Sequence, residues 1–177
     1  MKKINYIYIS KLDAAKRQLE IAIRLFMNNS DIVAIHTLTV AGHSILRDLS
    51  KKQGKESYMK DYMLKFVKPE HRKRCINKWN EAENFLKHAD KDPNKLLEFI
   101  TEQTEFLLWD SCFMYQNITN EHTPLILIYR MWFCTKNPDI FNDDYRKAIL
   151  KSTINLKLDF NNRRQFLEYL PEATKLK

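Results

Sequence analysis

The scarcity of turn-forming residues is the feature that most constrains the fold. The chain has 2 glycines and 5 prolines among 177 residues, whereas a sheet of many short strands needs such residues at turn after turn. The length corresponds to one domain, and a hydrophobic content of 44% is sufficient for a core and argues against disorder. We therefore predict a single all-α domain of residues 1–177, built as an antiparallel bundle of six to eight helices.

The N-terminal part of the sequence shows where the first two helices begin. Residues 1–9 include a β-prone stretch rich in Tyr and Ile, which we expect to form a short strand or an extended arm lying on the helices. Ser10 opens an S-x-x-D capping box, so the first helix is predicted to start there. A polar turn follows, and its last residue, Ser30, can cap a second helix over about 31–51. That helix is apolar around much of its circumference, so we predict that it is central, with Gly42 allowing a close helix crossing.

Apolar residues at helical spacing predict the remaining helices. Their ranges, in chain order, are 58–67, 69–89, 93–99, 101–115, 124–134, 139–152 and 161–170. The first of them is expected to bury Met59, Tyr62, Met63 and Phe66. Pro171 is expected to stop the last one, and residues 153–177 are predicted to form a peripheral C-terminal segment.

The balance of charge limits the classes of partner. The chain carries 30 Lys and Arg residues against 22 Asp and Glu residues, a formal net charge of +8 with a pI near 9.3. Such an excess suits a polyanion such as nucleic acid, and it also suits an ordinary solubilising surface. Basic residues gather in two runs, at 47–55 and at 68–74, which together could follow phosphates if they shared a surface. The second run contains Arg72 and Arg74, which we select as candidate binding residues.

The cysteines and the apolar runs bear on the compartment. Cys75, Cys112 and Cys134 are odd in number, lie far apart and form no C-x-x-C pair, a pattern typical of reduced thiols. The longest apolar run, 124–134, is far shorter than the roughly 20 residues that span a bilayer. We therefore expect a cytoplasmic protein with no membrane segment.

One stretch combines a regular apolar stripe with an unusual polar face. Between residues 75 and 89, apolar side chains recur every three or four positions and are expected to face a core. On the opposite side Asn77, Glu81, Asn84 and His88 follow one another at the same spacing. An amide, a carboxylate and an imidazole thus form one outward strip, which is either solvated surface or part of a site.

Two histidines and an aspartate form a second constellation. His36 and His43 lie seven residues apart, so they point the same way on the second helix and could bind a metal with His88 or Asp110 as a third ligand. A histidine in an apolar helix is more often a core residue that is hydrogen-bonded to a neighbour, which is the alternative interpretation of both. Asp110 lies in an apolar context and needs a His, an Arg or a helix N-terminus to offset its desolvation. It is either half of a structural ion pair or a group that orients an imidazole.

The hairpin AAKRQLEIAIRLFMNNSDIVAIHTLTVAGHSIL, residues 14–46, resembles the opening of HEPN domains. HEPN ribonucleases carry Arg-Asn-x-x-x-His on a late helix, and two copies meet in a dimer to cut RNA without a metal. Asn84 and His88 match the last part of that motif, whereas Glu83 stands in place of the arginine and Lys87 is the nearest substitute cation. The resemblance implies that His88 acts as general acid or base and that Asn84 holds it or the phosphate.

Three further stretches, KLDAAKRQLEIAIRLF, NFLKHADKDP and TEFLLWDSCFMYQ, resemble a broad family of bacterial proteins, and that resemblance implies no activity. Our leading hypothesis is a HEPN-like homodimer that binds RNA or a nucleotide without a cofactor, in a defence or toxin-antitoxin setting. If the protein is an enzyme, a metal-independent ribonuclease is the first hypothesis. A metal-dependent enzyme with a histidine cluster and a non-catalytic protein-interaction module are the alternatives.

Overall fold

The computed structural model describes residues 5–90, 93–121, 123–141, 143–144 and 158–174. This part of the chain contains seven α-helices and no strand, which confirms the all-α fold class. In chain order the helical elements are α1 (Lys11–Met27), α2 (Ile32–Lys52), the π-helix η1 (Tyr58–Tyr62), the 3-10 helix η2 (Met63–Phe66), α3 (Pro69–Lys87), α4 (Glu102–Thr119), α5 (Pro124–Lys136), α7 (Arg163–Glu168) and α8 (Leu170–Ala173). None of these helices is both long and apolar enough to cross a membrane.

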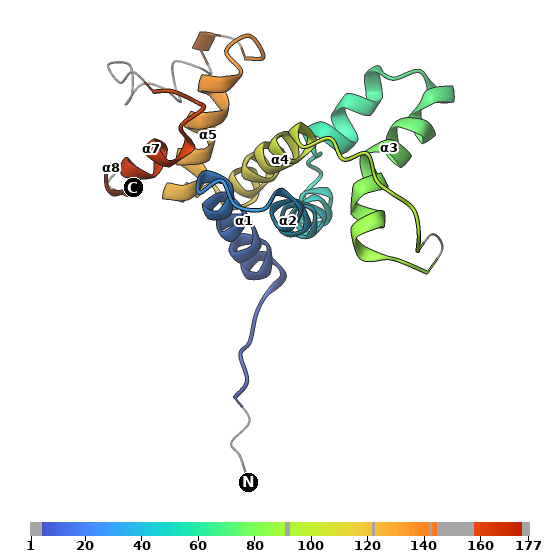
Figure 1. Cartoon of the computed structure of the whole chain (residues 1–177), viewed down its shortest axis with the longest axis horizontal. Helices are drawn as coiled ribbons and strands as arrows, with labels where there is room; N and C mark the ends of the chain where they lie inside the picture. Colours follow the sequence, from blue (N-terminus) through green and yellow to red (C-terminus); the bar gives the residue numbers. More distant parts are fainter. Residues whose placement is uncertain (1–4, 91–92, 122, 142, 145–157, 175–177) are drawn as a thin grey trace.

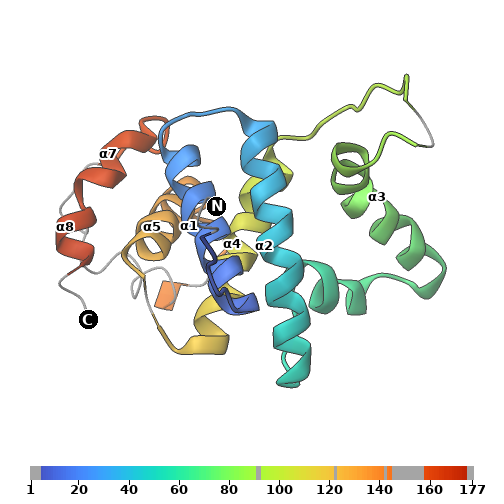
Figure 2. The same cartoon turned by 90° about the horizontal axis from the view of Figure 1, so that it is seen from below.

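Four helices form the body of the molecule. α1 and α2 pack as an antiparallel hairpin, α4 lies against both of them, and α5 closes the bundle on the side of α1 (Figure 1). α7 and α8 cover the outer side of α5. In both views α3 lies outside this bundle, and it packs against α2 (Figure 2). The second helix is therefore central, as its apolar circumference predicts.

Helix boundaries follow local capping chemistry at most positions. The backbone N–H of Asp13 donates to Ser10 Oγ at 3.0 Å and closes the predicted capping box at the start of α1. The prediction that Ser30 caps α2 is wrong. Asp31, one residue later, accepts the N–H of Ala34 at 2.9 Å and caps the helix instead. A carboxylate is the stronger acceptor there and interacts favourably with the positive end of the helix dipole.

The core is aromatic and is centred on α5. Phe26, Tyr129, Trp132 and Phe133 are fully or almost fully buried, and their rings meet at edge-on or tilted angles. Phe166 of α7 is also fully buried and joins this cluster. A helix that is apolar on all sides needs neighbours on all sides, which explains why α5 lies between α1, α4 and the C-terminal helices.

The segment between α2 and α3 differs from its prediction. Residues 58–66 form a π-helix followed by a 3-10 helix instead of one α-helix. Tyr62, Met63 and Phe66, which were expected to be buried, are 42%, 39% and 71% exposed. The spacing that would bury all three side chains on an α-helix does not hold in these two short helices, and Met63 faces an open cavity.

Two further helix predictions are wrong and one lies outside the described residues. Residues 95–100 are extended, because a helix of so few residues nucleates poorly and Leu96 is 91% exposed, with nothing to pack against. Pro171 does not end the helical region. It occupies the first turn of α8, where proline is tolerated. Nine of the 14 residues of the predicted helix over 139–152 are not described.

The N-terminal residues 5–9 have no regular secondary structure. They project away from the bundle instead of lying on it (Figure 1), and Tyr8 is 98% exposed. The β-prone composition predicted an extended backbone, but no strand partner is present in the described part of this chain.

α3 contacts the body mainly through polar groups. Ala82 is its one fully buried residue, while Cys75 and Trp79 of the predicted apolar stripe are only half-buried. Lys60 of η1 donates to Asn80 at 2.8 Å, and Gln103 of α4 donates to the backbone oxygen of Trp79 at 2.9 Å. The apolar stripe is real but shallow, so the other face of α3 is left open to solvent.

Candidate functional site

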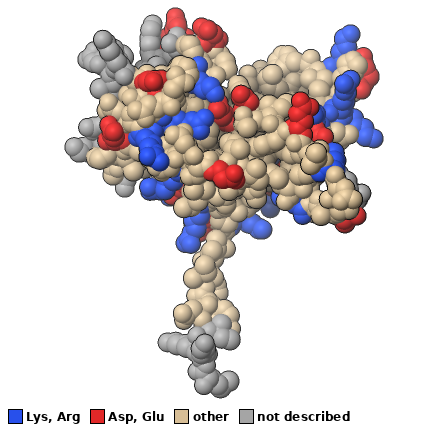
Figure 3. All heavy atoms as spheres, viewed as in Figure 1, with Lys and Arg blue, Asp and Glu red and all other residues tan. Residues whose placement is uncertain are grey.

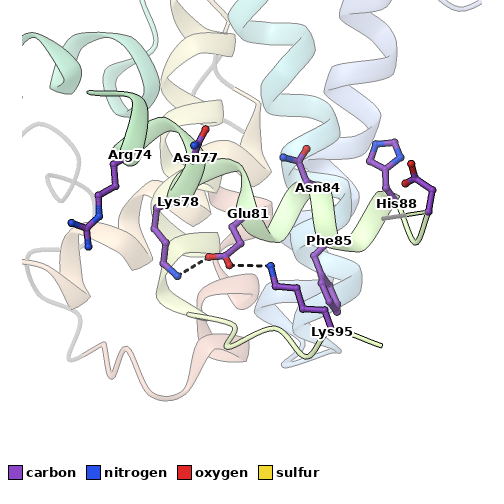
Figure 4. A pocket seen from close by; sticks show the side chains of 9 residues that line it. Arg74, Asn77, Lys78, Glu81, Asn84, Phe85, His88 and Lys95 are labelled. Carbon is purple, nitrogen blue, oxygen red and sulfur yellow. Dashed lines mark hydrogen bonds and ion pairs between the residues drawn. The ribbon is translucent and has the colours of Figure 1, made fainter. Parts of the chain in front are cut away.

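A groove of about 880 Å³ runs along the exposed face of α3. Its wall is formed by α3, by the residues that follow it, and by one residue of the extended segment 95–100. The lining side chains are Arg74, Asn77, Lys78, Glu81, Asn84, Phe85, His88, Asp90 and Lys95 (Figure 4). All four residues of the predicted polar strip therefore line one surface. We call this cavity the α3 groove.

The end of the helix changes how His88 is presented. α3 ends at Lys87, and His88 has an extended backbone with φ −136° and ψ 134°. Its N–H still donates to the backbone oxygen of Asn84 at 3.1 Å, so the two residues stay adjacent. The prediction that Asn84 and His88 lie on consecutive turns of one helix is therefore wrong in detail, although both side chains reach the groove at the same edge (Figure 4).

The groove contains three cations and two carboxylates. Glu81 links two of the cations, accepting from Lys78 Nζ at 2.6 Å and from Lys95 Nζ at 3.5 Å (Figure 4). Arg74 is exposed and makes no ion pair or hydrogen bond within the described part of the chain. Its guanidinium is thus available to an anion, and guanidinium groups match the geometry of phosphate oxygens.

Two of the predicted binding residues belong to a different cluster. Glu83 lies on the inner side of α3 and accepts from Lys87 at 2.7 Å and from Lys60 at 3.3 Å. Burial disfavours the charged form of Glu83, but the hydrogen bond from Lys87 and the charge of Lys60 outweigh it, so the pKa of Glu83 is lowered. Burial also lowers the pKa of Lys60, despite the opposing effect of Glu83. Lys87 is therefore paired with Glu83 and is not among the residues that line the groove.

The basic run that begins α3 extends the groove surface. Arg72, Lys73 and Arg74 are exposed in the first two turns of the helix, and Arg72 Nε donates to the backbone oxygen of Val67 at 3.0 Å. In Figure 3, Lys and Arg side chains lie at the α3 edge of the molecule and also over its other half. The other basic run is partly neutralised, because Arg47 and Lys51 both pair with Asp61. The two runs therefore differ in how freely they can meet a phosphate.

Asp110 and the two histidines of α2 lie in the interior of the protein instead of in the groove. His43 Nε2 is 2.8 Å from Asp110 Oδ2, and both side chains are fully buried. His36 Nδ1 is 2.9 Å from Thr104 Oγ1. A buried carboxylate at position 110 was expected to need a histidine, an arginine or a helix N-terminus. Asp110 has two of these partners, because it contacts His43 and also accepts backbone N–H groups at the start of η1.

The histidine cluster proposed for a metal does not assemble. His88 is exposed on α3, while His36 and His43 are buried beside different partners. Within the described residues, no three His, Cys, Asp or Glu side chains are arranged to hold a metal ion. His36 and His43 instead have the hydrogen-bonded core environment that was the alternative interpretation.

Several residues of the site were not identified from the sequence. Lys78 and Phe85 are near neighbours of the polar strip, and helical spacing from Glu81 could have included them. Lys95 and Lys60 come from segments that approach α3 only in the folded chain. No local pattern indicates such long-range contacts.

The fold and the groove define a class of protein: an all-α bundle with a solvent-open, partly basic groove on a peripheral helix. No protein-family description, curated protein or solved structure matches the chain.

Proposed function

We propose that the α3 groove binds the phosphate backbone of RNA. The observation that supports this best is that one open groove contains Asn84, His88 and the unpaired Arg74, and that the basic run of α3 continues its surface. Arg72, Lys73 and Arg74 are three neighbouring exposed cations in the first two turns of α3, and their mutual repulsion is unfavourable. An anion bound beside them would offset that cost.

The dimensions of the groove favour a polymer over a mononucleotide. Arg74 and Asn84 are separated by ten residues of α3, which is about 15 Å along the axis at ~1.5 Å per residue. A single phosphate cannot contact both ends. The proposal is therefore a chain of several nucleotides along α3, with Arg74 at one end and the Asn84 and His88 edge at the other.

Binding without cleavage is the form of the proposal that the charges support. A phosphoryl-transfer site needs a cation close to the imidazole to stabilise the developing charge. Lys87, the residue before His88, is held by Glu83 at 2.7 Å on another side of the helix. We therefore expect a labelled RNA to remain intact while it is bound. Cleavage that disappears in His88→Ala would replace this proposal with a ribonuclease.

Fluorescence anisotropy of a short labelled single-stranded RNA tests the binding proposal. With about three phosphate contacts, affinity should fall roughly 20-fold between about 50 mM and 200 mM salt. Arg74→Gln should weaken binding severalfold and flatten the salt dependence, whereas Arg17→Gln on the exposed face of α1 makes the same charge change away from the groove and should have little effect. Absence of binding at low salt, or equal loss in both variants, would end the proposal.

We also propose that two copies pair around this groove. Ile76 and Leu96 adjoin the groove residues Asn77 and Lys95 in the chain and are 39% and 91% exposed. A second copy that covered these two side chains would bury apolar surface that is otherwise open to solvent. Light scattering should give twice the 21.3 kDa of one chain, and Leu96→Ser should shift the mass toward the monomer. A monomer at high concentration would leave RNA binding to a single groove.

A further inference from the structure

Four aromatic rings form a ladder from the core to the surface, and the ladder ends just before α3 begins. Trp109, which is 7% exposed, meets Tyr58 edge-on at 5.6 Å. Tyr58 stacks on Tyr62, with ring centroids 5.4 Å apart and an interplanar angle of 22°. Tyr62 in turn meets Phe66 at 5.3 Å and 68°. The exposed fraction rises outward to 71% at Phe66, the last ring of this aromatic ladder.

The outer ring has a free face, unlike the inner ones. Tyr58 and Tyr62 each have two ring neighbours, whereas Phe66 has only Tyr62 among the described residues. A ring covered on both faces cannot keep 71% of its surface exposed, so at least one face of Phe66 is open to solvent. The ladder joins this ring to the core. A flat ring held in this way loses little conformational freedom when a planar group stacks on it.

A guanidinium group lies against the backbone next to Phe66. Arg72 Nε donates to the backbone oxygen of Val67 at 3.0 Å, which joins the first turn of α3 to the end of η2. The two terminal nitrogens of Arg72 have no acceptor among the described residues, and the side chain is exposed. An open aromatic face with an arginine beside it suits a single-stranded nucleic acid, because the ring can take a base and the guanidinium a phosphate.

The local charge favours an anionic ligand over an apolar protein partner. Residues 65–74 contain five Lys and Arg residues and one carboxylate, Glu70. Lys65 pairs with Glu56 at 2.6 Å, but both side chains are exposed and solvent screens such a pair. An apolar partner that covered Phe66 would desolvate some of these cations without pairing them, whereas a polyanion neutralises them.

We propose that Phe66 stacks on one unpaired base of the RNA that the α3 groove binds, with Arg72 on an adjacent phosphate. Arg74 of the groove lies about 9 Å along the helix axis from Lys68, the N-cap of α3, at ~1.5 Å per residue. A strand that passes round this end of the helix connects the groove with Phe66. The inference rests on the RNA-binding function proposed above and names its substrate class, a single strand, because the bases of a duplex are already stacked and paired.

A strand without bases separates stacking from phosphate binding. Fluorescence anisotropy at low salt compares a short adenosine oligomer with an abasic ribose-phosphate oligomer of the same length and label. The wild type should bind the adenosine oligomer about tenfold more tightly, within the range that one stacked base contributes. Phe66→Leu keeps an apolar side chain but removes the flat face. It should abolish most of this difference and leave the affinity for the abasic oligomer unchanged.

Three further variants serve as controls. Tyr8→Leu makes the same kind of change at an exposed ring of the N-terminal arm and should alter neither affinity. Phe66→Trp keeps a flat face and should bind the adenosine oligomer at least as tightly as the wild type. Because Phe66 is uncharged, Phe66→Leu should leave the salt dependence unchanged, whereas Arg74→Gln should flatten it for both oligomers.

The possible outcomes distinguish this inference from the function on which it rests. If neither oligomer binds at low salt, RNA binding by the α3 groove is wrong and the stacking site is wrong with it. If both oligomers bind and Phe66→Leu weakens them equally or not at all, only the stacking proposal is overturned. It is also overturned if Phe66→Leu changes the mass measured by light scattering but not the affinity for RNA, since the ring then belongs to a protein interface.

Discussion

At the scale of single residues, the most connected group in the interior is the carboxylate of Asp110. It accepts from the hydroxyl of Ser57 and lies 2.8 Å from His43 Nε2. A serine, a histidine and an aspartate therefore meet, but the carboxylate stands between the other two. In a nucleophilic triad the imidazole must take the proton of the serine, and here the serine donates to the aspartate instead. The cluster anchors η1 and does not activate a nucleophile.

His36 gives the folded protein a specific pH dependence. Burial lowers the pKa of its imidazole from 6.5 to about 4. Between these values the unfolded chain binds a proton that the folded chain does not, so stability is complete above about pH 6.5 and declines as the pH falls toward 4, by up to about 3 kcal/mol. Urea titrations across this window should show the decline in the wild type and a smaller one in His36→Gln.

An exposed histidine provides the control for that experiment. His71→Gln removes an imidazole at the surface of α3 and should leave the pH profile of the wild type unchanged. The carboxylates whose pKa values are lowered, such as Asp61 and Glu83, lose their contribution at more acidic pH and are common to all three proteins. If His36→Gln and the wild type have parallel profiles, the assignment to His36 is wrong.

Gly42 lies in the α1–α2 crossing but does not need to be glycine. A Cβ atom there would lie 3.5 Å from the backbone oxygen of Ala15 and 3.6 Å from Gln18 Cβ, which are ordinary contacts. Gly42→Ala should therefore stabilise the protein by about 0.5 to 1 kcal/mol through the helix preference of alanine. Gly42→Leu should destabilise it, because a longer side chain meets α1. Equal destabilisation in both variants would show that the crossing is tighter than these distances indicate.

At the scale of elements, α3 depends on polar links more than any other long helix. Its one fully buried side chain is the small Ala82, and it is tied to η1 through Lys60, which contacts Asn80 and Glu83. A helix with little buried apolar area opens at a lower free energy than the body of the protein. The groove therefore lies on the least firmly held of the long helices, where a bound ligand can add order.

Lys60→Met tests this tether. Methionine keeps the apolar stem of the side chain but removes the charge, so the inner carboxylate of Glu83 loses one partner, at a cost of roughly 1 to 2 kcal/mol. Native-state hydrogen exchange of the amides in the second half of α3 should accelerate about tenfold, with smaller changes in α1 and α5. Lys78→Met removes the exposed pair with Glu81 on the same helix and should have little effect.

At the scale of the whole molecule, the accessibility of the three thiols distinguishes the buried bundle from the peripheral helix α3. Cys112 and Cys134 are fully buried in α4 and α5, whereas Cys75 on α3 is partly exposed. Burial also raises the pKa of the Cys112 thiol, which further reduces its reactivity. We expect one thiol to react rapidly with a disulfide reagent in the native protein and the other two to react only as the protein unfolds.

Cys75→Ser is the matched variant for the thiol experiment. It should lose the rapid phase and keep the slow one. Three thiols that react at similar rates would mean that the bundle opens as readily as α3, contrary to the separation between the aromatic core and the peripheral helix.

The distance along the chain over which a signal acts explains which predictions succeeded. The helices of the body were found from caps and apolar spacing because those signals act within a few residues, as Ser10 shows for α1. The polar strip of α3 was found for the same reason. The failures occurred where contacts outside the segment determine the outcome. Residues 58–66 border a cavity of about 540 Å³, and 95–100 have no regular secondary structure, with Lys95 beside Glu81 of α3.

The sequence by itself determined the helical class, most helix boundaries and the gathering of Asn77, Glu81, Asn84 and His88 on one face, because backbone hydrogen bonds and helical periodicity are local. Only the tertiary structure decided that Lys60 would engage Glu83, that Asp110 would hold η1, and that aromatic rings from η1, α4 and α5 would line one cavity. These contacts join residues distant in the chain, and their free energy depends on the burial that the completed fold provides.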